Sequence, residues 1–252
     1  MIDSIIFDID GIIIDVSKSY REAIRQTSKE FLGKTVSQEE VSAIKKIPEF
    51  NNDWDATFEL VCLLEKNVST GEFRKKVCKV TEKDRKRKKY IELFKVFQAK
   101  YLGEKLYKTI YGKKPVSKEK GLINNEKLMI PKKVFMELKK EFKLGIVTGR
   151  PRKEAEYSLK LNGLDAFFDF KKIVCREDTK KSKPDAKPLF LAAKNIGSKK
   201  AVYVGDSIND VLAAEKAKMK SIYLGKENLG DYSIKKIEDL MEGIKWLKSE
   251  KQ

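Results

Sequence analysis

Histidine is absent from this chain of 252 residues. Catalytic triads that use histidine and metal sites with histidine ligands are therefore excluded, because no imidazole is available. Any acid or base chemistry must instead use carboxylates or lysine.

Cysteine is scarce. Cys62, Cys78 and Cys175 are isolated in the sequence, and no two of them have CxxC spacing. This pattern indicates neither a disulfide framework nor a zinc site, and it favours reduced thiols in the cytoplasm.

Long apolar runs are also missing. No stretch approaches the roughly 18 apolar residues that a membrane-spanning helix needs. An apolar strand begins almost at the N-terminus, which leaves no room for a signal peptide. We expect a soluble, cytoplasmic protein with no membrane partner.

Positive charge is abundant and unevenly distributed. Charged residues make up 37% of the chain, above the roughly 25% typical of soluble proteins, a composition that favours adaptation to heat. Residues 17–122 hold 26 basic and 15 acidic residues, a net charge of +11 within the chain's +17. Such a surface suits nucleic acid or small anionic substrates. We expect no specific nucleic-acid partner.

The first strand is expected at residues 5–7, an apolar run suited to a strand buried on both faces of a parallel sheet. Asp8 follows it, and Asp10 returns a side chain to the same side of an extended segment. Two carboxylates so near to each other either raise the pKa of one of them or bind a cation such as Mg²⁺. Alternatively, Asp8, Asp10 and Gly11 form a surface turn.

Alternating helices and strands are expected after residue 131. Strands are predicted at residues 144–147, 173–175, 201–204 and 221–224, with helices between them and an amphipathic helix at the C-terminus. Repeated strand and helix units predict an α/β fold, a Rossmann-like parallel sheet with helices on both faces.

Residues 17–122 show only helical patterns and interrupt that fold after its first strand. The predicted domains are an α/β core of residues 1–16 and 123–252 and a helical unit of residues 17–122. The aromatic side chains Tyr90, Phe94, Phe97 and Tyr101 have the spacing of one helix face, which favours packing over base stacking.

Polar residues also lie at the ends of other predicted elements. Thr148, Gly149 and Asp206 follow strands, and Lys183 precedes a helix. Thr148 and Gly149 offer a hydroxyl and backbone N–H groups to a phosphate. Lys183 offers an ammonium that neutralises negative charge. Asp206 can supply a hard oxygen ligand for Mg²⁺, and Asp210, four residues later, can orient that ion or its waters.

The motifs DIDG, TGR, KPDAKP and GDSIND occur in this order at these positions. Together they resemble the haloacid dehalogenase-like hydrolase superfamily, in particular the phosphoglycolate-phosphatase-like branch whose helical cap is inserted after the first motif. The resemblance covers the whole core. In the helical unit it depends on position and helical character alone.

The resemblance implies a Mg²⁺-dependent phosphatase that acts on a small phosphorylated metabolite through an aspartyl-phosphate. Asp8 matches the nucleophile, and Asp10 matches the acid that protonates the leaving oxygen and then activates water. Thr148, Gly149 and Lys183 match the phosphate-binding positions. The implied metal site comprises Asp8, the backbone carbonyl of Asp10, Asp206 and the outer acid Asp210.

Small departures from the family pattern concern uncharged positions. Ile12 replaces a small polar residue, and Ala186 stands where many relatives have proline. Both changes bear on substrate rather than on reaction type. A phosphomutase of the same superfamily is the nearest alternative, and a nucleic-acid-binding protein with an inactive phosphatase core is a distant one.

Substrate selection is expected in the helical unit and beside the phosphate loop. The candidate residues are Arg21, Asn51, Asn52, Trp54 and Arg150. Arg21 is alternatively a surface residue, Trp54 a core residue, and Arg150 a solvated loop residue. The sequence predicts a monomer or a homodimer and does not choose between them.

Overall fold

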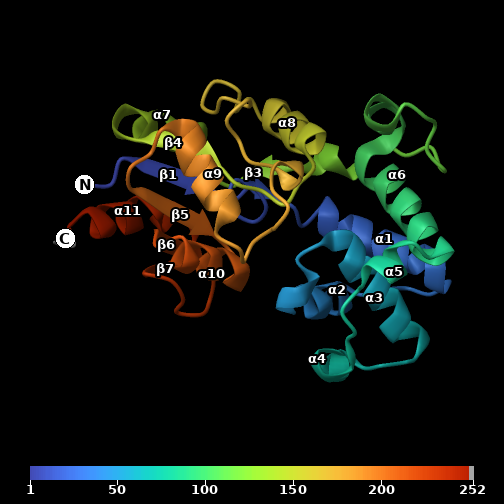
Figure 1. Cartoon of the computed structure of the whole chain (residues 1–252). Coiled ribbons are helices and arrows are strands. Elements are labelled where there is room, and N and C mark those ends of the chain that lie inside the picture. Colours follow the sequence, from blue (N-terminus) through green and yellow to red (C-terminus); the bar gives the residue numbers. More distant parts are fainter. Residues whose placement is uncertain (250–252) are drawn as a thin grey trace. The chain divides into compact units, whose positions relative to one another are not determined.

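The computed structural model describes residues 1–249, which form two compact units (Figure 1). One unit comprises residues 1–15 and the described chain from Lys127 onward, and the other comprises Val16–Glu126. The helical unit begins one residue earlier than expected, at Val16 instead of residue 17. It ends four residues later than expected, at Glu126 instead of residue 122. Residues 123–126 belong with the helices because Ile123 is buried and Glu126 accepts hydrogen bonds from Ser19 and Tyr101.

A five-stranded sheet forms the centre of the α/β unit. Its strand order is β4-β1-β5-β6-β7, and every neighbouring pair is parallel. The strands are β1 (Ser4–Phe7), β4 (Lys143–Ile146), β5 (Ala201–Gly205), β6 (Lys220–Leu224) and β7 (Tyr232–Ile234). Phe7, Ile146 and Val204 pair in register, so β1, β4 and β5 end at one edge. The parallel α/β fold expected from the sequence is confirmed.

Both faces of this sheet are covered by helices. Ile6 belongs to a buried cluster with Leu189 and Ala213, whereas Phe7, the next residue, packs edge-to-face on Phe135. Successive strand residues point to opposite faces, so β1 is buried on both. The helices are α7 (Lys132–Glu141), α8 (Arg152–Leu161), α9 (Lys187–Ile196), α10 (Ile208–Lys216) and α11 (Leu240–Ser249).

Three features of the α/β unit differ from the sequence expectations. Residues 173–175 form no strand, and only a single bridge joins Val174 to Val147. The strand β7 follows what was expected to be the last strand. A short antiparallel ribbon, β2 (Ile14–Asp15) with β3 (Lys127–Leu128), was not anticipated. Pairs of two residues carry too little pattern to be read from sequence.

The second unit is helical, as the sequence indicates, and no strand occurs in its described residues. Its core is apolar and aromatic, with Tyr20 stacked on Tyr101 at 4.1 Å between ring centroids and Phe97 fully buried. The aromatic side chains of the long helix therefore pack inside this unit. The helices are α1 (Tyr20–Leu32), α2 (Gln38–Lys45), α3 (Asp53–Glu65), α4 (Phe73–Lys76), α5 (Glu82–Arg85) and α6 (Lys88–Tyr111).

The long helix α6 is interrupted at Gly103, whose φ of 73° and ψ of 169° are not helical. A Cβ on Gly103 would lie 2.6 Å from the backbone nitrogen of Gly121, and a Cβ on Gly121 would lie 2.5 Å from the carbonyl oxygen of Leu102. Two glycines therefore allow the returning chain to cross the helix backbone.

None of the helices within residues 1–249 has both the length and the apolar character that a membrane crossing requires. Cys62, Cys78 and Cys175 are free.

Candidate active site

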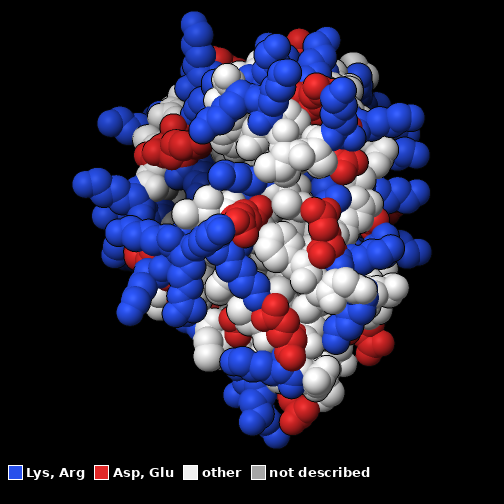
Figure 2. All heavy atoms as spheres, turned by 90° about the vertical axis from the view of Figure 1, so that its right-hand side faces the viewer, with Lys and Arg blue, Asp and Glu red and all other residues white. Residues whose placement is uncertain are grey.

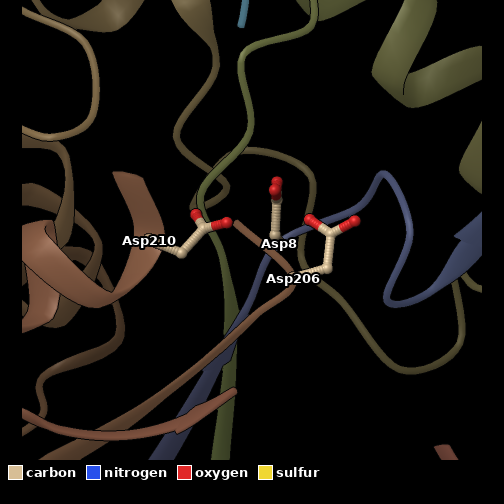
Figure 3. A group of neighbouring side chains, drawn as sticks. All are labelled: Asp8, Asp206 and Asp210. Carbon is tan, nitrogen blue, oxygen red and sulfur yellow. The ribbon is translucent and has the colours of Figure 1, made fainter. Parts of the chain in front are cut away.

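The carboxyl ends of β1, β4 and β5 carry most of the predicted site residues. Asp8 directly follows β1, Thr148 lies two residues after β4, and Asp206 directly follows β5. Because these strands are adjacent and end in register, their loops meet at one edge of the sheet. Figure 3 shows Asp8, Asp206 and Asp210 side by side at this edge.

Asp8 is 8% exposed and is held by two contacts. Its Oδ1 accepts a hydrogen bond from the backbone N–H of Ile9 at 2.8 Å, and its Oδ2 lies 2.9 Å from Lys183 Nζ. Burial, reinforced by the neighbouring aspartates, raises the pKa of Asp8 well above its ordinary value, although Lys183 opposes the shift. An additional cation beside Asp8 would favour its ionised form.

Lys183 links the first strand to the last motif. Its Nζ lies 2.9 Å from Asp8 Oδ2 and 2.6 Å from Asp210 Oδ1, and it donates to the Tyr203 hydroxyl at 2.9 Å. Burial disfavours the charged amine, but Asp210 and Asp8 outweigh this effect and raise the pKa of Lys183 well above its ordinary value. The ammonium is therefore fixed beside the candidate nucleophile.

Asp210 has both carboxylate oxygens in protein contacts. Oδ1 meets Lys183 and accepts from the Tyr203 hydroxyl at 3.1 Å, while Oδ2 accepts from the backbone N–H of Ser207 at 3.0 Å. The Ser207 contacts form a capping box at the start of α10. These bonds suit Asp210 to an outer position that orients other groups.

Asp8, Asp206 and Asp210 each offer a carboxylate oxygen, and these atoms lie within 4.8 Å of one another. Hard oxygen donors of this kind suit Mg²⁺. The residues therefore fit the cation that the sequence suggests. The Asp10 carboxylate is not a member of this cluster.

Asp10 instead pairs with Arg150. The guanidinium approaches Asp10 Oδ1 through Nε at 2.7 Å and through Nη2 at 2.6 Å. Arg150 is buried, so its interpretation as a solvated loop residue is wrong. Burying a guanidinium is costly without a partner, and Asp10 provides one.

The loop predicted to bind phosphate lies between β4 and α8. Thr148 is buried, and its Oγ1 accepts a hydrogen bond from the backbone N–H of Arg150 at 3.1 Å. Gly149 is exposed, and a Cβ there would contact nothing within 4 Å. The space beside this residue is therefore open.

The other four candidate residues lie in the helical unit. Asn52 caps α3 by accepting from the backbone N–H of Trp54 at 3.0 Å, and Trp54 packs edge-to-face on Phe94. Both have structural roles there. Arg21 is half-buried near the start of α1, and Asn51 is exposed. Their contact with substrate stays a prediction.

Tyr203 is the site residue that the sequence analysis missed. It lies on β5, is fully buried, and contacts both Lys183 and Asp210. Its signal was a single aromatic residue within the otherwise aliphatic strand AVYVG, because a buried phenol normally requires a hydrogen-bond partner.

Comparison with known proteins connects this geometry to a family. The family model described as haloacid dehalogenase-like hydrolase matches residues 90–224. Phosphatase Tt82 from Thermococcus thioreducens has a similar structure, with a TM-score of 0.70 and 26% identity, covering 95% of this chain and 99% of that one.

Two curated relatives match by sequence. Imidazoleglycerol-phosphate dehydratase of Phytophthora nicotianae is 30% identical over 220 residues, which cover 86% of this chain and 42% of the relative. Pyrophosphatase PpaX of Bacillus velezensis is 37% identical over 123 residues, 43% of this chain and 56% of the relative. The chain thus spans about half the length of these relatives.

Proposed function

The chain belongs to the haloacid dehalogenase-like hydrolase family, and on that premise we propose that it hydrolyses a small phosphate ester through an aspartyl-phosphate on Asp8. One observation carries this proposal. A buried carboxylate lies 2.9 Å from a buried lysine and within a cluster of two further aspartates at the carboxyl edge of a parallel sheet. Phosphoryl transfer requires chiefly such positioning and charge neutralisation.

In the first step, an oxygen of Asp8 attacks phosphorus while the bond from phosphorus to the leaving oxygen breaks. Asp10 gives its proton to that leaving oxygen. Lys183 stabilises negative charge on Asp8 and on the phosphoryl oxygens, and the Thr148 hydroxyl and the Gly149 backbone hold the phosphoryl group.

In the second step, a water oxygen attacks phosphorus and Asp10 takes the water's proton. The bond between phosphorus and Asp8 breaks, which restores the carboxylate and releases phosphate. Asp8, Asp206 and the backbone carbonyl of Asp10 would hold Mg²⁺, with Asp210 outside them. When bound, such an ion would supply positive charge that stabilises the negative charge of the reacting groups.

We assign substrate selection to the helical unit Val16–Glu126. This unit interrupts the core between β2 and β3, and such insertions can exclude water and discriminate between substrates. Arg21 and Asn51 are the clearest candidates to test, because substituting Asn52 or Trp54 would also disturb α3.

The test is a screen of phosphate esters with Mg²⁺, with Asp8→Asn as the blank. Pyrophosphate is included because one relative is named a pyrophosphatase. We predict that Asp8→Asn abolishes turnover, since an amide is a poor nucleophile, and that its circular dichroism spectrum stays unchanged. Steady-state turnover retained by this variant would exclude the mechanism. Turnover that requires a bisphosphate activator would instead identify a phosphomutase.

A further inference from the structure

Arg150 is fixed in place by its own backbone. Its N–H donates to Thr148 Oγ1 at 3.1 Å, and its carbonyl oxygen accepts from the N–H of Arg176 at 3.0 Å. The side chain is 1% exposed and ranks among the largest fully buried side chains of the described chain. The guanidinium therefore has little freedom to move.

The contact with Asp10 is specific in its geometry. Two donors of the guanidinium, Nε and Nη2, converge on one oxygen, Oδ1, at 2.7 and 2.6 Å. The Asp10 side chain keeps 32% exposure, so the carboxyl group is anchored on one side and open on another. Replacing a buried ion pair by apolar residues is often neutral or stabilising, so stability alone does not explain this pair.

We propose that Arg150 is the positioning residue of Asp10. It anchors the carboxyl group through Oδ1, so that Oδ2 exchanges the proton with the leaving oxygen and then with water. This inference rests on the proposed function, because it assigns Arg150 a role through the acid and base of that reaction. It also replaces the expectation that Arg150 selects the substrate, since its guanidinium already binds Asp10.

The anchoring matters most when the leaving oxygen needs a proton. After Asp10 gives up its proton, the carboxylate that remains faces a cation that stays charged at any working pH. An alkoxide leaving group depends strongly on that proton, whereas p-nitrophenolate leaves readily without it. Loss of the anchor should therefore affect the two classes of ester unequally.

The experiment compares an alkyl phosphate turned over by the wild-type protein with p-nitrophenyl phosphate. We expect Arg150→Met to lower kcat on the alkyl phosphate by about 100-fold, within the range for general acid catalysis. On p-nitrophenyl phosphate we expect a loss below about 10-fold, and KM should change little on either ester because Asp10 acts in the chemical step. Arg150→Lys keeps the charge without the two-pronged geometry and should restore part of the alkyl activity.

Arg152→Met is the matched control. Arg152 lies two residues away, pairs with Asp178 at 2.5 Å and donates to the carbonyl oxygen of Phe170 at 2.9 Å. It ties a loop to the start of α8, so its loss should lower the melting temperature and leave the ratio of the two activities unchanged.

A double variant separates positioning from a general loss of structure. If Arg150 acts through Asp10, then Asp10→Asn with Arg150→Met should be no slower on the alkyl phosphate than Asp10→Asn alone. Equal losses on both esters in Arg150→Met, or additive losses in the double variant, would overturn the role of Arg150. The proposed function would survive that result if Asp10→Asn still lost mainly alkyl phosphate turnover. A wild-type protein inactive on every ester would overturn both.

Discussion

Single glycines decide whether the aspartates of the site can approach one another. A Cβ on Gly11 would lie 2.0 Å from Asp206 Oδ2, and a Cβ on Gly205 would lie 2.3 Å from Asp210 Cβ. The φ of Gly11 is also positive, at 74°. Gly11 of the first motif thus leaves space for Asp206 of the last motif, and Gly205 leaves space for Asp210 of its own motif.

Gly11→Ala should therefore lose activity out of proportion to stability. The positive φ alone costs roughly 1–2 kcal/mol for a residue with a Cβ, and Gly33→Ala, with a φ of 64° and open space, controls for that cost. We expect Gly11→Ala to displace the Asp206 carboxylate and to weaken Mg²⁺ binding, measured by calorimetry. A metal titration like that of wild type would contradict this account.

The lowered pKa of Asp3 should make the stability of the fold depend on pH in the acidic range. Burial would raise its pKa, but hydrogen bonds from the Lys199 and Lys200 backbone N–H groups and the Ser198 hydroxyl lower it to about 2. Because the folded pKa lies below the ordinary value of 3.8, these bonds stabilise the protein above that pH and are lost as pH falls through about 2. Asp3→Asn should unfold at lower urea concentration than wild type at pH 6, and the difference should narrow by pH 3. If the difference in urea midpoint between the two proteins were the same at pH 6 and pH 3, the stabilising role of ionised Asp3 would be wrong.

Residue identity was easier to predict than residue contact. Asp8, Lys183 and Asp206 could be singled out because each motif follows a strand or precedes a helix. The pairing of Arg150 with Asp10 could not, because a sequence does not specify which way a long side chain turns in a loop.

Whole elements were predictable where their ends carry chemical signals. Ser37 and Asn52 cap α2 and α3 through their side chains, and Gly33 ends α1 in the left-handed conformation. Strand β7 has three residues and only one of them is buried, so it lacks the apolar run that identifies β1. Short, half-exposed strands gain their stability from neighbours that a local pattern does not contain.

The break in α6 gives an element-scale prediction. Gly103→Ala places a methyl group 2.6 Å from the Gly121 backbone, which must shift the returning chain or distort the helix. We expect a loss of unfolding free energy of about 2–5 kcal/mol, the sum of the costs of the positive φ and of overpacking. Gly33→Ala should lose only the unfolding free energy that the positive φ costs. Urea denaturation of both variants measures the difference between their losses. Equal losses would mean that the crossing at Gly121 is not tight.

At the scale of the molecule, positive charge is widespread. Figure 2 shows Lys and Arg over much of one face, with Asp and Glu scattered among them. A distributed excess of this kind raises the local concentration of small anions without defining a groove for a polymer. We therefore keep the proposal of a small phosphorylated substrate and no specific nucleic-acid partner.

The two units give a prediction about a shortened chain. Asp15 pairs with Lys127 in the β2–β3 ribbon, so residues 16–126 can be replaced by a short turn centred on Asn-Gly. We expect this core to fold, as judged by near-ultraviolet circular dichroism, and to hydrolyse p-nitrophenyl phosphate with less discrimination among esters. A core that discriminates as wild type does would remove substrate selection from the helical unit.

The same ribbon has a consequence for how such a protein can diversify. The chain leaves and re-enters the α/β unit at paired residues, whose Cα atoms in an antiparallel ladder are about 5 Å apart. Any polypeptide whose ends meet at that separation can be grafted there without altering the register of β1. The ribbon is therefore a point at which a different insert can replace residues 16–126 while the α/β unit keeps its own residues.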